Sequence, residues 1–154
     1  PPPRSTLFPY TTLFRSDRQH KELKADEIHT IFYDRYVNIK APFWVDDSEF
    51  SKKDGGFWAT IDIVVNGNQQ QSEAAGTGRL DAVSNAIKAA TGVHFTLVSY
   101  TEHALTKGST SDALAYVGII NGEGKIVWGA GCHNDIVTAS VYALVSAVNR
   151  RHAK

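Results

Sequence analysis

Two stretches of the chain share one order of hydrophobic and polar positions. In the first, apolar residues occupy every second position of residues 58–65, which predicts a strand with one buried face. An Asn66-Gly67 pair, typical of a tight hairpin turn, leads into a polar return strand at residues 69–75. Apolar residues at helical spacing follow and predict a helix that opens at Asp81.

The same order recurs in the second half of the chain. Strands are predicted at residues 114–120 and 125–128 around Asn121-Gly122, and a helix at residues 135–150. Each copy carries a Gly-x-Gly motif before its helix, and the two motifs lie 53 residues apart (76 to 129 and 78 to 131). A repeat of this length predicts a duplicated supersecondary unit whose two copies bury their apolar faces together.

The remaining segments complete the predicted fold. Residues 25–37 carry an apolar stripe at helical spacing, and residues 95–100 have the pattern of a central strand. Residues 38–56 include an acidic stretch and end in two glycines, which is typical of a linker that packs little. We therefore expect an α+β fold of two βββα-type units, an antiparallel sheet with helices packed on one face, preceded by a short helical subdomain segment.

The other face of the predicted sheet requires a partner. It would expose Trp58, Tyr116 and Trp128, which together make a larger apolar patch than monomers usually tolerate. Burial of that face in a homodimer is the simplest solution.

The first residues do not read as part of a fold. Residues 6–16 are TLFPYTTLFRS, which is the first-frame translation of a common sequencing adapter without a mismatch. We therefore interpret residues 1–16 as an assembly artefact, 17–56 as a helical subdomain remnant and linker, and 57–154 as the principal domain. On this interpretation the protein continues upstream, and the chain is a C-terminal fragment.

Composition narrows the possible functions. The 154 residues include 16 Lys and Arg and 16 Asp and Glu, so there is no overall field to attract nucleic acid or an anionic membrane. The single cysteine, Cys132, excludes an intrachain disulfide and fits a reducing compartment. No apolar run is long enough to span a bilayer. We expect a cytoplasmic protein without a nucleic-acid or membrane partner.

The Gly-x-Gly motifs are the strongest candidates for a binding site. Backbone N–H groups at a glycine loop can approach a ligand closely, and a following helix N-terminus favours a carboxylate or phosphate. Neither motif continues into a dinucleotide fingerprint or a nucleotide P-loop. Asp81 and Asp135 open the two helices, and each either caps its helix or receives a ligand ammonium. The second role, beside an anion site, would suit a zwitterionic amino acid.

No complete active site is evident, and no catalytic residue or metal ligand is predicted. The six histidines show no zinc-type spacing, and the carboxylates offer no obvious pair. His103, which lies beside Glu102, is either a ligand-facing group or a structural residue. Cys132 and His133 are adjacent, and adjacent residues rarely point at each other, which disfavours a Cys-His nucleophile.

Three motifs together resemble the C-terminal regulatory domain of 2-isopropylmalate synthase, over residues 23–150. They are Gly76-Thr77-Gly78-Arg79-Leu80-Asp81-Ala82, then Tyr100-Thr101-Glu102-His103-Ala104-Leu105, and then Trp128-Gly129-Ala130-Gly131 followed by the helix from Asp135 to Arg150.

The resemblance implies that residues 57–154 form an allosteric amino-acid-binding domain, a dimer of paired βββα units that binds the end product leucine near the dimer interface. The parent enzyme of this family condenses acetyl-CoA with 2-oxoisovalerate in leucine biosynthesis. Its catalytic TIM barrel, which binds a divalent metal, lies upstream. The fragment should therefore be inactive alone and should need no cofactor of its own.

The resemblance also implies a set of leucine-binding residues. The family usually has Asn at position 77 and Pro at position 79, and these departures bear on a ligand hydrogen bond and on loop rigidity. The residues that match the family's ligand loops and their flanking stretches are Gly76, Thr77, Gly78, Leu80, Asp81, Ala82, Tyr100, His103, Ala104, Leu105, Ala113, Ala115, Gly131, Cys132 and Ile136.

Three alternatives remain open. The same fold would serve a citramalate or homocitrate synthase, with isoleucine or lysine as the effector. It would also serve as a purely structural dimerisation module that has lost its effector site. The third alternative is a free-standing enzyme that uses Cys132 and His133.

Overall fold

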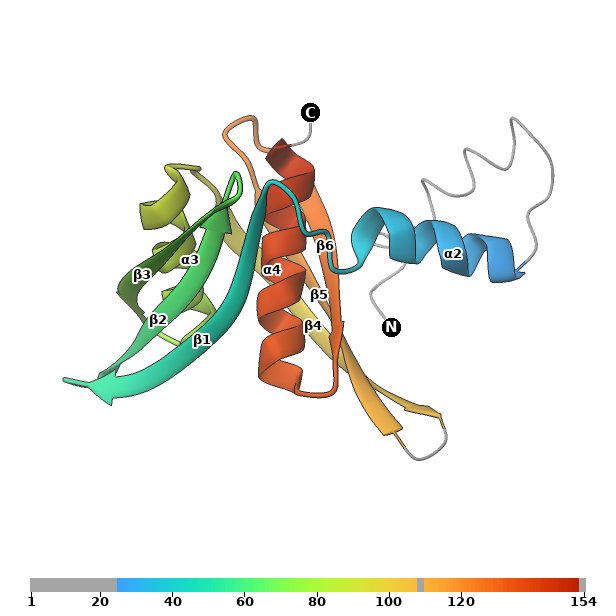
Figure 1. Ribbon diagram of the computed structural model, residues 1–154, viewed down its shortest axis with the longest axis horizontal. Coiled ribbons are helices and arrows are strands. Elements are labelled where there is room, and N and C mark those ends of the chain that lie inside the picture. Colours follow the sequence, from blue (N-terminus) through green and yellow to red (C-terminus); the bar gives the residue numbers. More distant parts are fainter. Residues whose placement is uncertain (1–24, 108–109, 153–154) are drawn as a thin grey trace.

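The computed structural model describes residues 25–107 and 110–152, which form two three-stranded antiparallel sheets and three helices (Figure 1). The strand orders are β1-β2-β3 and β4-β5-β6. The predicted α+β class and the two βββα units are confirmed, with the strands divided between two sheets. In chain order the elements are α2 (Ala25–Tyr36), β1 (Phe43–Lys53), β2 (Gly56–Val65), β3 (Asn68–Gly76), α3 (Arg79–Thr91), β4 (Thr96–Lys107), β5 (Thr110–Ile120), β6 (Ile126–His133) and α4 (Ile136–His152).

Each sheet forms one unit with the helix that follows it. Unit one comprises β1 to β3 and α3, and unit two comprises β4 to β6 and α4. The first strand of each unit carries a bulge at the same point, between Val45 and Asp47 in β1 and between Leu97 and Ser99 in β4. The shared bulge aligns the two units residue by residue. In each sheet the second of its three strands in chain order, β2 or β5, is the central one. The strand β4 therefore lies at an edge, and the prediction that residues 95–100 form a central strand is wrong.

The aligned ladders identify equivalent positions in the two units. Phe50 lies opposite Ala59 in unit one, and Glu102 lies opposite Ala115 in unit two, in each case three residues beyond the bulge. Phe50 and Glu102 are therefore structural equivalents, although one is aromatic and the other is charged.

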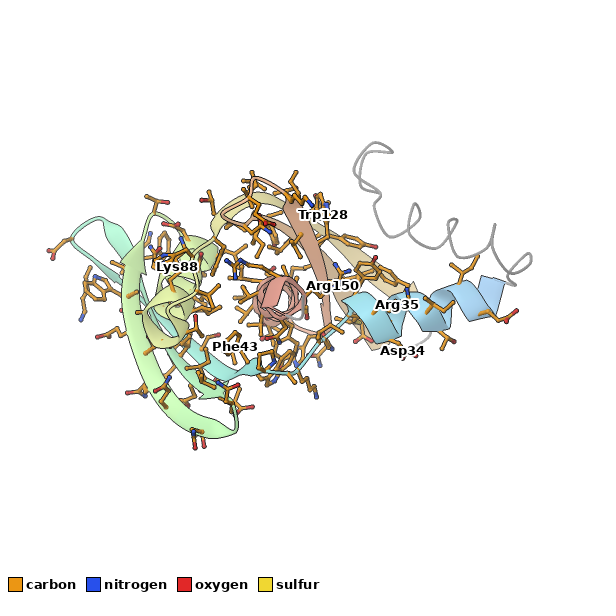
Figure 2. All side chains as sticks on the ribbon, turned by 90° about the horizontal axis from the view of Figure 1, so that it is seen from above. Asp34, Arg35, Phe43, Lys88, Trp128 and Arg150 are labelled. Atoms are coloured by element: carbon orange, nitrogen blue, oxygen red, sulfur yellow. The ribbon has the colours of Figure 1, made fainter. Side chains whose placement is uncertain are left out.

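The helices α3 and α4 lie between the two sheets, so that one continuous core joins the units (Figure 2). The central helix α4 packs on β5 and β6 of its own sheet and also contacts β1. Ile61 and Ile63 of unit one and Val117 and Leu144 of unit two are fully buried in this core. Burial of each such side chain contributes about 1.5–3 kcal/mol.

Residues 38–56 do not form the expected linker. They contain β1, which pairs with β2 along its length, and the first residues Phe43, Trp44 and Val45 are buried. The buried side chain of Asn149 on α4 accepts a hydrogen bond from the Phe43 N–H (3.0 Å) and donates one to the Phe43 carbonyl (2.7 Å). The prediction is wrong because the rest of β1 is a mostly exposed edge strand, whose polar sequence carries no regular alternation.

The second Gly-x-Gly motif is not a loop. Gly129 and Gly131 lie inside β6, where an added Cβ would come within 2.2 Å and 2.0 Å of backbone atoms of α4. These glycines let the helix approach the strand closely. Gly131, opposite Ala115, corresponds to Ala74 of β3, opposite Ala59, so the 53-residue spacing of the two motifs is not a structural equivalence.

The helix α2 and the residue that follows it, Val37, pack on the face of the second sheet opposite α4. Val37 forms a parallel bridge with Ala130, and both belong to one buried cluster. The expected exposed patch of Trp58, Tyr116 and Trp128 is wrong, because Trp128 is only 7% exposed and the other two are half-buried. The chain itself therefore covers part of the face that was expected to need a partner.

Two further expectations concern the start of the chain and membrane-spanning segments. The segment expected to be an adapter artefact, residues 1–16, lies outside the described residues. No helix in the described part of the chain is long and apolar enough to cross a membrane.

Candidate functional site

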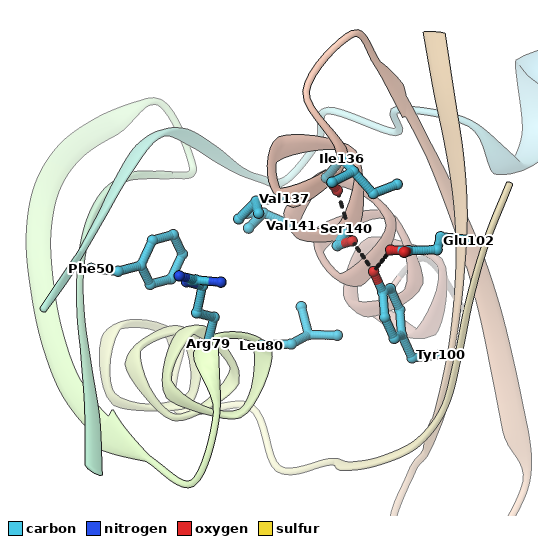
Figure 3. Close-up of a pocket in the computed structure, with 9 residues that line it drawn as sticks. All are labelled: Phe50, Arg79, Leu80, Tyr100, Glu102, Ile136, Val137, Ser140 and Val141. Atoms are coloured by element: carbon cyan, nitrogen blue, oxygen red, sulfur yellow. Dashed lines mark hydrogen bonds between the residues drawn. The ribbon is translucent and has the colours of Figure 1, made fainter. Parts of the chain in front are cut away.

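A cavity of about 320 Å³ lies between the two units, beside the first turns of α3 and α4 (Figure 3). The strands β1 and β4 supply its other walls. Its volume is at the small end of the range of ligand pockets and fits a small metabolite. The lining residues are Phe50, Arg79, Leu80, Tyr100, Glu102, Ile136, Val137, Ser140 and Val141.

The cavity walls come from equivalent positions of the two units. Phe50 and Glu102 correspond by strand register, and Arg79 and Ile136 are the first residues of α3 and α4. The paired residues differ in charge, since Arg79 is cationic where Ile136 is apolar, and Glu102 is anionic where Phe50 is aromatic. The repeat therefore borders a solvent-open cavity with chemically unlike halves, in which both charged side chains are exposed.

Tyr100 lies at the centre of the polar wall of unit two. Its hydroxyl lies 2.8 Å from Ser140 Oγ and donates a hydrogen bond to the Glu102 carboxylate. Ser140 Oγ donates in turn to the carbonyl of Ile136 at 2.8 Å. Burial and then the hydrogen bond to Glu102 raise the pKa of Tyr100 above its ordinary value, so the hydroxyl keeps its proton at neutral pH.

Arg79 carries positive charge on the wall of unit one. Its guanidinium carbon lies 5.9 Å from the ring centre of Phe50 and 5.6 Å from that of Phe57, within the range of cation–π contacts. Across residues 25–107 and 110–152, Arg79 forms no ion pair. Its charge therefore remains available to an anion in the cavity.

The two helix starts are satisfied in different ways. Asp135 caps α4, because its carboxylate accepts hydrogen bonds from the N–H (3.0 Å) and hydroxyl (2.7 Å) of Thr138, and these bonds lower the pKa of Asp135. The helix α3 follows Gly78, which offers no side-chain cap, and Asp81 instead accepts from the Thr77 N–H at 2.9 Å. The start of α3 is thus the more open position for an anion.

The structure brings three predicted site residues into the cavity wall: Leu80, Tyr100 and Ile136. A further five lie around the start of α3 and do not line the cavity. One of them, Gly76, allows close packing, because an added Cβ would lie 2.4 Å from the backbone nitrogen of Ala82. The five are Gly76, Thr77, Gly78, Asp81 and Ala82.

The remaining predicted residues lie on β4, β5 and β6. Ala113 and Ala115 are buried in the core between the sheets, and Gly131 lies beneath α4. Cys132 lies in the cluster under α2, where burial raises the pKa of its thiol. The side chains of His103, Ala104 and Leu105 lie outside what the structure describes.

Cys132 and His133 do not form a nucleophile and base. As neighbours in β6 they point to opposite faces, with Cys132 under α2 and the His133 ring 5.6 Å from the ring of Tyr142 on α4. Within the described residues, no group of three or more His, Cys, Asp or Glu side chains is placed to hold a metal ion.

Six lining residues were missed by sequence reasoning. Val137, Ser140 and Val141 follow Ile136 by one, four and five positions, so helical spacing alone places them on one face with it. Phe50 lies in the segment expected to be a linker, and the sequence carries no signal for it. The two charged lining residues, Arg79 and Glu102, lie within the motifs quoted above, and their charge could have indicated a binding role.

Comparison with known proteins gives a consistent result. Residues 22–152 match the family model of the LeuA allosteric (dimerisation) domain. The chain is similar to the 2-isopropylmalate synthase of Desulfitobacterium hafniense (strain Y51), with 44% identity over 142 residues that cover 92% of this chain and 25% of that protein.

Two further relatives carry the same description. The 2-isopropylmalate synthase of Helicobacter hepaticus is 40% identical over 158 residues, which cover 97% of this chain and 28% of that protein. The 2-isopropylmalate synthase of Agrobacterium fabrum is 37% identical over 140 residues, which cover 88% of this chain and 25% of that protein. The chain spans about a quarter of the length of the curated relatives it matches.

Proposed function

The chain belongs to the LeuA allosteric (dimerisation) domain family, and on that premise we propose that it is the leucine-binding feedback-regulatory domain of a 2-isopropylmalate synthase. The cavity between the two units is the proposed leucine site. One observation carries the proposal: this cavity has a cationic and an anionic wall with apolar side chains between them, which is the pattern of a free amino acid.

The cavity suits leucine in size as well as in polarity. At about 320 Å³ it is at the small end of the range of ligand pockets and has room for a free amino acid. Leu80, Ile136 and Val137 offer apolar surface to an isobutyl group, whose burial contributes about 0.8 kcal/mol for each carbon group.

Feedback requires that leucine bind two states of the whole enzyme unequally. We assign to the parent protein a cytoplasmic, metal-dependent TIM barrel that condenses acetyl-CoA with 2-oxoisovalerate, and to this chain its homodimeric regulatory part. The support is the description of the relatives and their greater length. The helix α4 offers a physical link, because its first turn lines the cavity and its buried Asn149 holds the start of β1.

Thermal unfolding of the purified 154-residue chain tests the proposal against its alternatives. A ligand at 100 times its dissociation constant stabilises the folded state by about 2.7 kcal/mol, so saturating leucine should raise the melting temperature clearly. A larger shift with isoleucine or lysine would instead indicate the regulatory domain of a citramalate or homocitrate synthase. No shift with any of these amino acids would leave a structural dimerisation module.

A variant that fills the cavity locates the site. Val137→Phe places a ring in the cavity and should abolish the leucine shift. The matched control is Val98→Phe on β4, a residue that is 43% exposed and outside the lining, and it should keep the shift. Equal leucine binding by both variants would show that leucine binds elsewhere. Sedimentation of the wild-type chain tests the proposed homodimer.

A further inference from the structure

The two units contribute unlike charges to the cavity at positions that the repeat makes equivalent. An unmodified repeat would place like groups across the cavity from each other. Instead, Arg79 corresponds to Ile136, and Glu102 corresponds to Phe50. Figure 3 shows Arg79 and Glu102 on opposite sides of the cavity, with the apolar side chains between them. The cavity therefore has an electrostatic direction, which a symmetric ligand would not use.

The position of Arg79 is unfavourable for helix stability. It is the first residue of α3, where the N–H groups already carry partial positive charge, and a cation there is repelled. The guanidinium is nevertheless held at the cavity by the rings of Phe50 and Phe57. An anion in the cavity would interact favourably with both the guanidinium and the uncapped helix start.

On the opposite wall, the polar groups have one hydrogen-bond contact more than they have protons to fill. When Glu102 is ionised, the series from Glu102 through Tyr100 and Ser140 to the Ile136 carbonyl has three contacts but only two hydroxyl protons. One contact is then oxygen to oxygen without hydrogen. A ligand ammonium supplies the missing donors, because it can donate to Glu102 and to the Tyr100 oxygen while Tyr100 donates to Ser140.

We propose that Arg79 and Glu102 are the specificity-determining residues that orient the amino acid, with its carboxylate toward Arg79 and the start of α3 and its ammonium toward Glu102 and Tyr100. This inference rests on the proposed function and adds a direction to it. The ligand class becomes free α-amino acids with apolar side chains. A carboxylic acid with the same carbon skeleton lacks the ammonium that Glu102 would bind, and an amine lacks the carboxylate that Arg79 would bind.

The test measures dissociation constants by ligand-observed NMR for three probes. Leucine carries both charges, leucinol replaces the carboxylate with a hydroxymethyl group, and 4-methylpentanoate lacks the ammonium. Arg79→Gln should weaken leucine about 10- to 100-fold and leave leucinol almost unchanged, since only leucine presents a carboxylate. Glu102→Gln should weaken leucine and leucinol and leave 4-methylpentanoate almost unchanged. Arg79→Lys, which keeps the charge, should restore part of the leucine affinity.

Matched controls remove the same charges away from the cavity. Lys88→Gln takes a cation from α3 that also lies over a ring, 4.9 Å from the centre of Phe95. Glu73→Gln takes an exposed carboxylate from β3. Both controls should bind leucine like the wild type.

The outcomes separate this inference from the proposed function. If the wild-type chain ignores leucine, the proposed function fails and this inference fails with it. If leucine binds but Arg79→Gln weakens leucine and leucinol equally, or neither, then Arg79 does not face the carboxylate and the inference alone is overturned. Unchanged 4-methylpentanoate binding by Arg79→Gln would show that Arg79 does not face the carboxylate and would overturn it as well.

Discussion

Unit one and unit two share a topology and a bulge, but they bury their third strands to different extents. β3 is polar and mostly exposed, whereas β6 is buried from Val127 to Gly131. Unit two is covered on both faces, by α4 on one and by α2 on the other. The two units therefore share the course of the backbone, whereas their side chains differ with the surroundings of each unit.

The helices also approach their sheets differently. In unit one, Ser72 of β3 donates a hydrogen bond to the Ala86 carbonyl of α3 at 2.8 Å. Its equivalent in β6 is Gly129, where an added Cβ would come within 2.2 Å of the Ala147 nitrogen in α4. At these two equivalent positions α3 is held to its strand by a side-chain hydrogen bond, whereas α4 lies directly against the strand backbone. Further along α4, Arg150 donates a hydrogen bond to the Trp128 carbonyl of β6 at 2.6 Å.

The close approach of α4 to β6 predicts the largest loss of stability. Gly131→Ala should destabilise the chain by about 3–5 kcal/mol in chemical denaturation, because its methyl group would lie 2.0 Å from the Ala139 carbonyl oxygen. The control is Ala74→Gly at the equivalent position of unit one, which should cost about 1 kcal/mol. Similar small losses in both variants would show that α4 can withdraw from β6 freely.

The second prediction concerns hydrogen bonds by which α4 of unit two holds the start of β1 in unit one. Asn149 is fully buried and bonds to Phe43 and to the Ile39 carbonyl, so Asn149→Ala should cost about 2–3 kcal/mol by leaving buried backbone groups unpaired. Asn85→Ala, which removes one exposed bond to the Ala75 carbonyl, should cost less than about 1 kcal/mol. Equal melting temperatures for the two variants would contradict this role of Asn149.

Much of the fold was predictable because its strongest signals are local. The alternation at residues 58–65, the Asn66-Gly67 turn and the helical spacing in both copies depend on neighbouring residues, and the structure confirms each of them. The strand β1 was not predictable in the same way. Its order comes from pairing with β2 and from contact with Asn149, which is distant in sequence.

The lining of the candidate site was predictable only in part, for a related reason. Leu80, Tyr100 and Ile136 stand within recognisable motifs, and the structure places all three in the cavity wall. The second Gly-x-Gly motif misled, because glycine serves two purposes that sequence alone does not distinguish: freedom in a loop and close packing in a strand. Gly129 and Gly131 serve the second.

The third prediction concerns where the two helices end. The helix α3 stops at Gly92, which has a φ of 74°, in the left-handed region that favours glycine, while α4 continues as far as His152. Gly92→Ala should therefore cost about 1 kcal/mol in thermal unfolding. Gly122→Ala, at a glycine without a positive φ and with open space around it, should cost clearly less. A larger loss at Gly122 would contradict the assignment.

The smallest effects are expected from variants that remove the N-terminal cap of α4 or add one to α3. Asp135→Ala removes the cap of α4 and should cost about 1 kcal/mol at pH 7, whereas Asp135→Asn, which keeps an acceptor oxygen but not the charge, should keep only part of that stability. The pKa of Asp135 is lowered in the fold, so its contribution is present above the ordinary aspartate pKa of about 4 and is lost as the pH falls through the lower folded value. The difference between wild type and Asp135→Ala should accordingly shrink in acid, and a constant difference would contradict the capping role.

The reciprocal change, Gly78→Asp, gives α3 the cap it lacks and should gain a few tenths of a kcal/mol, since the backbone there is extended and the space is open. The same variant should weaken leucine binding, because the new carboxylate would occupy the positive helix start that the ligand carboxylate is proposed to use.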